Sequence, residues 1–239
     1  MKILICAFSV LSCVLMGEAT VSRAESSEAK HVILLGASIG NGWNIGMLPN
    51  RIDAKGYTFE FIAEYVFDKS EPLNQILKRS PKPYAVILKE CSTYFPGKFE
   101  EQKRLMQQWI EALSKNGIIP IPATVVPVTT PRMLTVAYFK NLMKKYLPMG
   151  KINIEERQRY IIEYNDWIKK YAEEKGLAVL DLESALRRNN EDRRLRPELT
   201  SGDGMHLNRD AYSLLDAIVI PAMIKSEMNQ GSQAALARP

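Results

Sequence analysis

The chain has 239 residues, of which 46% are hydrophobic and 25% charged, and its formal net charge is +5. This is the composition of an ordinary globular protein, and the length is enough for one domain with a full core. The arginine pairs at 187–188 and 193–194 lie close together without interleaved aromatic residues. That pattern indicates a solvated loop and argues against a nucleic-acid interface.

The first 24 residues have the pattern of a secretory signal. Lys2 is followed by an apolar run, 3–16, and then by small and polar residues up to Ala24. The run is too short for a membrane span, and no later stretch is long and apolar enough. A lipoprotein box at 10–13 would leave an even shorter apolar core, so a lipoprotein is the less favoured alternative. We therefore expect a signal peptide at 1–24, an exported protein that is periplasmic or secreted, one domain at 25–228 and a disordered tail at 229–239.

The rest of the chain alternates predicted strands and helices. Short apolar strands separated by helical patterns predict a parallel sheet with helices on both faces. After the fourth strand, 127–150 form a longer excursion with a helix-like run at 133–147, which we interpret as a packed helix rather than a flap. Asn208 is the expected N-cap of the last helix, and Pro221 is expected to bend or end it. The predicted strands are 31–35, 57–63, 84–88, 118–124 and 177–180, and the predicted helices are 100–114, 152–174 and 209 to about 218.

Cysteine and histidine are scarce. Cys6 and Cys13 fall in the signal, which leaves Cys91 alone, so no internal disulfide and no cysteine-based zinc site is expected. No metal or cofactor is implied. Of the two histidines, His31 lies at the edge of the mature N-terminus. Any mechanism that needs a histidine must therefore use His206.

The first predicted strand runs into the turn 36–40, which reads GASIG. A dinucleotide fingerprint fails here because its third glycine would fall on Ile45, and a P-loop fails because Gly-Lys-Ser/Thr is absent. The turn matches the pattern G-x-S-x-G, which presents a serine nucleophile. Parallel sheets gather ligands at the carboxyl ends of their strands, and Ser38 stands at one. The alternative is an ordinary turn that connects a strand to a helix.

A serine nucleophile needs a base. The loop at 201–208 reads SGDGMHLN and places Asp203 three residues before His206. That spacing lets a carboxylate reach the imidazole Nδ1–H, which leaves Nε2 to take a proton. The alternative is an Asx-turn at Asp203 beside a surface histidine.

With these residues the chain resembles the SGNH hydrolases, also called GDSL esterases and lipases. The segment 36–39 matches the family's first block, with Ala37 in place of the usual aspartate, and 203–207 match its last block. The segments 164–167 and 176–182 resemble its long helix and fifth strand. The resemblance covers nearly the whole mature chain. It implies a flavodoxin-like three-layer α/β/α sandwich with a five-stranded parallel sheet in the order 2-1-3-4-5. Ser38 would be the nucleophile, His206 the general base and acid, and Asp203 the residue that orients His206.

The chain departs from the family at the oxyanion donors. The second block lacks its glycine, and Cys91 stands where the third block has its donor Asn. Loss of one donor typically costs about 100- to 1000-fold in rate. We expect the Ser38 N–H to be one donor and a backbone N–H or hydroxyl of Ser92 or Thr93 to be another, because a thiol such as Cys91 donates weakly.

Three further residues are considered for substrate binding. Glu90 follows the third strand and is interpreted either as an ion-pair partner of Lys89 or Arg132 or as a substrate ligand. Trp43 and Tyr94 are candidates to flank a sugar or an acyl group, but packing is the favoured interpretation for both. The sequence thus predicts a serine esterase that acts on an O-acyl group of a carbohydrate or on a small-molecule ester, without nucleic acid as a partner. The alternatives are a non-catalytic module that binds a glycan or a partner protein, and an O-acyltransferase.

Overall fold

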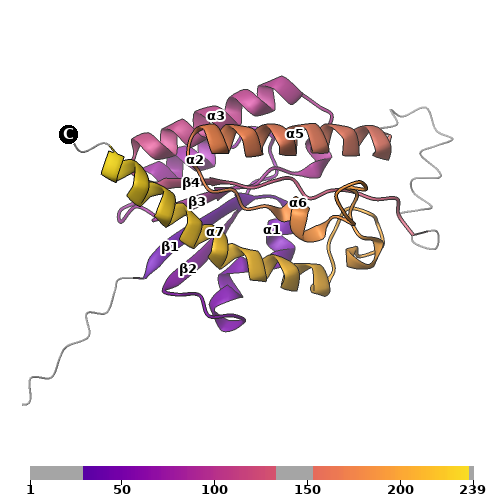
Figure 1. The fold of residues 1–239 in the computed structure, drawn as a ribbon, viewed down its shortest axis with the longest axis horizontal. Coiled ribbons are helices and arrows are strands. Elements are labelled where there is room, and N and C mark those ends of the chain that lie inside the picture. Colours follow the sequence, from indigo (N-terminus) through magenta and orange to yellow (C-terminus); the bar gives the residue numbers. More distant parts are fainter. Residues whose placement is uncertain (1–28, 133–152, 237–239) are drawn as a thin grey trace, which may run out of the picture.

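The central element of the fold is a parallel sheet in the order β2-β1-β3-β4. The computed structural model describes residues 29–132 and 153–236 and has helices on both sides of this sheet (Figure 1). The register pairs Leu35 of β1 with Leu88 of β3, so the two central strands end side by side. The strands are β1 (Lys30–Gly36), β2 (Tyr57–Ala63), β3 (Ala85–Leu88) and β4 (Ile119–Pro122).

Each face of the sheet carries its own hydrophobic core. Consecutive residues of a strand point to opposite faces, so Leu34 belongs to one core and Leu35 to the other. The first core is covered by α1 (Ser38–Trp43), α6 (Leu182–Leu186) and α7 (Arg209–Leu236). The second is covered by α2 (Ser70–Leu77), α3 (Phe99–Lys115) and α5 (Ile154–Glu174). Three short 3₁₀ helices complete the described elements: η1 (Ile45–Asn50), η2 (Ser92–Tyr94) and η3 (Pro197–Leu199). The three-layer α/β/α architecture is therefore confirmed.

The prediction of a fifth strand is wrong, because the described sheet has four strands. Leu180 makes a single parallel bridge with Ala123 and donates its N–H to the carbonyl of Pro122. On one side the Leu177 N–H is still bonded to the end of α5, at the carbonyl of Ala172. On the other side the Asp181 side chain already caps α6. Of the three residues between these two contacts, 178–180, only Leu180 makes a bridge, which is too few for a strand.

The last helix is longer than expected. Helix α7 passes through Pro221 and ends at Leu236, so residues 229–236 continue the helix and do not form the expected disordered tail. Contacts along the helix offset the backbone hydrogen bond that a proline removes. Glu227 accepts hydrogen bonds from Tyr57 and Tyr84, and Asn229 donates to the carbonyl of Gly176. Asn208 caps the helix as predicted, since its side chain accepts from the Ala211 N–H.

The predicted signal at 1–24 and the helix-like run at 133–147 lie outside the described residues. Within the described part of the chain, no helix combines the length and apolarity that crossing a membrane requires.

Candidate active site

Ser38 is the first residue of α1, two residues beyond the carboxyl end of β1. The glycines that follow it allow close packing. A Cβ on Gly40 would lie 2.4 Å from Phe61 Cε2, and one on Gly42 would lie 2.2 Å from the Tyr212 hydroxyl oxygen. The GASIGNGW segment therefore turns tightly from the sheet into a helix that packs against β2 and α7. This places a half-buried serine at the carboxyl edge of the central strand.

Asp203 and His206 are in contact in the loop before α7. His206 Nδ1 lies 2.5 Å from Asp203 Oδ2, and Asp203 Oδ1 accepts the backbone N–H groups of Met205 and His206 at 2.9 and 2.8 Å. An antiparallel bridge between Thr200 and Leu207 closes the loop. The i,i+3 spacing thus produces the predicted carboxylate–imidazole contact. The catalytic roles of both residues stay a prediction.

The Asp203 carboxyl group favours its ionised form. Burial acts to raise its pKa, but the hydrogen bonds from the His206 ring and from the backbone N–H groups of Met205 and His206 outweigh burial and lower the pKa. An ionised Asp203 accepts the Nδ1–H of His206 and selects the tautomer whose Nε2 carries a lone pair. The His206 side chain is 50% exposed.

The segment after β4 holds this loop at the carboxyl edge of the sheet. Thr129 donates its backbone N–H to Gly204 O at 2.9 Å, and Arg132 donates its backbone N–H to Gly202 O at 3.2 Å. Gly204 has a φ of +79°, and a Cβ there would lie 2.1 Å from Thr129 O. Only glycine fits this position, both for its backbone conformation and for the close approach of a neighbouring carbonyl. Asp203 and His206 therefore lie at the same edge of the sheet as Ser38.

The serine and the histidine are not hydrogen-bonded to each other. Ser38 Oγ makes no hydrogen bond with any residue in the ranges 29–132 and 153–236. The packing of Tyr212 against Gly42 joins the helix that begins at Ser38 to the helix that follows His206. Nucleophile–base contacts are often long without substrate and tighten in the Michaelis complex. The predicted contact of about 2.6–3.2 Å stays a prediction.

The segment that would supply the second oxyanion donor forms η2. Cys91 is only 6% exposed, and its Sγ lies 3.0 Å from Thr93 Oγ1. Ser92 is buried and Thr93 is exposed. The backbone N–H groups of Ser92 and Thr93 make no hydrogen bond within the described ranges. Cys91 has the burial of a packing residue, and the role of Ser92 or Thr93 as an oxyanion donor stays a prediction.

The two candidate substrate ligands are structural residues. Trp43 is 2% exposed, packs in the first core and donates its Nε1–H to Asp216 at 2.8 Å. Glu90 is fully buried and accepts from Lys69 Nζ at 2.8 Å and from Gln102 at 3.3 Å. Neither side chain is open to a substrate, so both assignments are corrected. The partner of Glu90 is Lys69, and not Lys89 or Arg132 as the sequence analysis considered.

Lys89 is a residue that the sequence analysis did not place in the site. Its side chain is 1% exposed, its ammonium donates to the backbone carbonyl of Glu90, and it packs on Gly36 at the turn before Ser38. Burial lowers its pKa, against the opposing effect of Cys91 and Glu90. A lysine directly after a fully apolar strand was the available sequence signal. No group of three or more His, Cys, Asp or Glu that fits a metal ion occurs among the described residues.

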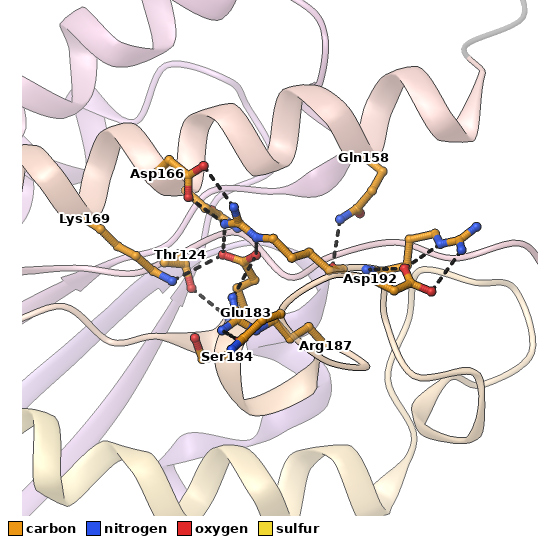
Figure 2. A network of polar contacts seen from close by, with 12 residues as sticks. Thr124, Gln158, Asp166, Lys169, Glu183, Ser184, Arg187 and Asp192 are labelled. Atoms are coloured by element: carbon orange, nitrogen blue, oxygen red, sulfur yellow. Dashed lines mark hydrogen bonds and ion pairs between the residues drawn. The ribbon is translucent and has the colours of Figure 1, made fainter.

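A second buried carboxylate organises the chain that leads into the 201–208 loop. Figure 2 shows Glu183 of α6 beneath the helix that carries Asp166 and Lys169. Arg193 pairs with both oxygens of Glu183 and also with Asp166, at 2.7 and 2.9 Å. Gln158 of α5 donates to the backbone carbonyl of Arg193 at 3.0 Å. The network fixes α5, α6 and the segment before η3 relative to one another.

No family model matches the sequence, and no curated protein matches it. Solved structures do match. A GDSL-like lipase from Bacteroides thetaiotaomicron is 19% identical, with 82% of this chain and 89% of that chain covered and a TM-score of 0.60. The lipase/acylhydrolase from Enterococcus faecalis is 17% identical, with 83% and 96% covered and a TM-score of 0.53. An acetyl xylan esterase is 20% identical, with 81% and 98% covered and a TM-score of 0.52. At this identity the similarity establishes the fold.

Proposed function

We propose that this chain, which has the fold of the SGNH hydrolases, is an exported serine esterase that removes an O-acyl group from a carbohydrate. The observation that carries the proposal is the Asp203–His206 pair, held at the carboxyl edge of the strand that delivers Ser38. The carbohydrate part is supported by the similarity to an acetyl xylan esterase. Export is supported by the apolar N-terminal run and the small residues up to Ala24.

In the proposed reaction, Ser38 Oγ attacks the ester carbonyl while His206 Nε2 takes the serine proton. The tetrahedral oxyanion is stabilised by the N–H groups of Ser38 and of Ser92 or Thr93. His206 then gives its proton to the leaving alcohol, and the acyl group stays on Ser38. A water molecule, deprotonated by His206, releases the acid. Asp203 keeps the imidazole in one tautomer and stabilises the imidazolium that forms in each step.

A second candidate function is a non-catalytic module that binds a glycan in the same crevice. It is favoured by the buried Cys91 at the position of the family's donor Asn and by the lack of a Ser38–His206 hydrogen bond within the described ranges. Covalent reactivity of Ser38 separates the two candidates, because a binding module needs no activated serine.

The test is labelling of the purified mature protein with a fluorophosphonate probe. We expect labelling in the wild type, loss in Ser38→Ala and in His206→Ala, and retention in Ser201→Ala, which removes an exposed serine of the same loop. A folded wild-type protein that takes no label would reject the esterase and favour the binding module.

A further inference from the structure

Arg157 spans the candidate site. It lies in the first turn of α5, and its Nε donates to the carbonyl of Phe95 at 3.1 Å while its Nη1 lies 3.4 Å from Met205 Sδ. Phe95 ends the segment that contains the candidate oxyanion donors, and Met205 precedes His206 in the chain. The guanidinium group therefore joins the two segments that would surround a bound ester.

The charge of Arg157 is not balanced by any carboxylate among the residues at 29–132 and 153–236. Other arginines are paired with carboxylates: Arg51 with Asp216, Arg79 with Glu60 and Arg193 with Glu183. For Arg157, burial lowers the pKa, and the only opposing influence is Cys91. The nearby Glu155 forms an ion pair with Arg194 instead. A partly buried guanidinium without a carboxylate is costly, and an anion would relieve that cost.

The preceding segment, 133–152, supplies no counter-charge, because it contains four lysines and neither Asp nor Glu. The position of Arg157 on its helix is also unfavourable on its own, since cations are disfavoured near the positive end of the helix dipole. Both features make the surroundings of Arg157 favourable to an anion.

The helix that carries Arg157 is fixed in register. The next residue, Gln158, is 3% exposed and accepts the Val128 N–H at 2.8 Å while donating to the backbone carbonyl of Arg193 (Figure 2). With α5 fixed in this way, the bond from Arg157 Nε to the Phe95 carbonyl holds the guanidinium beside the 201–208 loop. A preorganised cation binds an anion at a lower entropic cost than a mobile one.

We propose that Arg157 recognises a carboxylate on the ester substrate, so that the enzyme prefers esters that carry a free carboxylate. Nε is engaged by Phe95, and Nη2 has no hydrogen-bond partner in the described ranges. The Nη1–Nη2 edge matches a carboxylate bidentately, a geometry that lysine does not reproduce. The inference deepens the proposed esterase function and rests on it.

The kinetic test compares 4-nitrophenyl acetate with mono-4-nitrophenyl succinate, which carries a free carboxylate. The ratio of kcat/KM for the succinate ester to that for the acetate ester should fall about 10- to 100-fold in Arg157→Met, as expected for one lost charge-assisted hydrogen-bond pair. Arg157→Lys should give an intermediate ratio. Arg159→Met, an exposed arginine on the same helix, should leave the ratio unchanged. An equal loss on both esters would assign Arg157 to transition-state stabilisation and overturn the proposal.

A binding measurement keeps the inference separate from the esterase proposal. Calorimetric titration of succinate into Ser38→Ala should show binding that Arg157→Met, combined with Ser38→Ala, weakens at least about 10-fold. Absence of catalysis with this binding intact would reject the esterase and keep the carboxylate site. Hydrolysis of both esters with an unchanged ratio in Arg157→Met, or succinate binding that does not depend on Arg157, would overturn the carboxylate site alone.

Discussion

Asp203 uses its two oxygens for two different tasks: Oδ1 accepts two backbone N–H groups, and Oδ2 contacts the His206 ring. Asp203→Asn keeps an oxygen for the backbone and changes the group that faces the imidazole. We expect a folded protein whose kcat falls roughly 100- to 10 000-fold, because the amide favours the wrong tautomer. Ester hydrolysis measures the effect, with Asp210→Asn, an exposed carboxylate at the start of α7, as the control. Similar kcat values for Asp203→Asn and the wild type would remove Asp203 from the mechanism.

The same residue predicts a pH dependence of stability. The Asp203 pKa is lowered in the folded protein, so its contribution is fully present above the unfolded value of about 3.9 and is lost as pH falls through the folded value. Asp203→Asn should therefore lower the free energy of unfolding at pH 7 by about 1 kcal/mol, with the difference vanishing towards pH 2. Urea titrations at both pH values measure this. A difference that grows on acidification would contradict the assigned direction.

Gly40 and Gly231 make a matched pair for the packing of α1. Alanine at position 40 would push its Cβ into the Phe61 ring, whereas nothing lies within 4 Å of a Cβ at position 231. We expect Gly40→Ala to lower the free energy of unfolding by about 1–3 kcal/mol, because the Phe61 ring would have to be displaced to make room for the added Cβ. Gly231→Ala should be neutral or stabilise by up to about 1 kcal/mol through helix propensity. Thermal unfolding of both variants tests this prediction. Equal stabilities would show that a glycine at position 40 is not needed for the close approach of α1 to Phe61.

At the scale of elements, Glu183 links α6 to the segment before η3 through Arg193. Glu183 is fully buried, whereas Asp166, the other partner of Arg193, has a side chain that is 58% exposed. Glu183→Gln should therefore lower the free energy of unfolding by about 1–3 kcal/mol, because it leaves a partly buried guanidinium poorly paired. Asp166→Asn should cost less than about 1 kcal/mol, as exposed pairs do. Chemical denaturation compares the two variants. A larger loss of unfolding free energy for Asp166→Asn would mean that the main contact of Arg193 is with Asp166 at the helix surface.

The elements that the sequence predicted best are those with a local cause. Strand β2 was predicted at its observed bounds because an apolar, β-branched and aromatic run indicates a strand. The Asp203–His206 contact follows from an i,i+3 spacing. The prediction of a fifth strand failed because Leu177 is bonded to the end of α5 and Asp181 caps α6, and only Leu180 of the three residues between them makes a bridge. No local pattern predicts the partners of Glu90 or Arg157, because these contacts depend on how separate segments of the chain pack together.

The whole molecule is two cores that share one sheet. Leu34 and Leu35 are neighbours in β1, and both are fully buried, yet one faces α1, α6 and α7 while the other faces α2, α3 and α5 (Figure 1). Neither set of helices can bury its apolar surface without the strands between them. The site lies at one edge of that sheet, so its geometry depends on both layers together. Loss of either core should therefore unfold the other.

The tryptophans allow this coupling to be measured layer by layer. Trp43 packs in the first core, and Trp109 and Trp167 pack in or against the second, which accounts for all three in the chain. In Trp43→Phe the fluorescence reports the second core, and in Trp109→Phe combined with Trp167→Phe it reports the first. Within each variant, we expect the fluorescence midpoint in urea to coincide with the midpoint from far-ultraviolet circular dichroism, as two-state unfolding requires. Adding Leu34→Ala should lower the free energy of unfolding by about 2–5 kcal/mol. Both urea midpoints should therefore fall together, even where the fluorescence comes only from the opposite core. A second-core signal that stays in place while the first core melts would mean that the layers unfold separately.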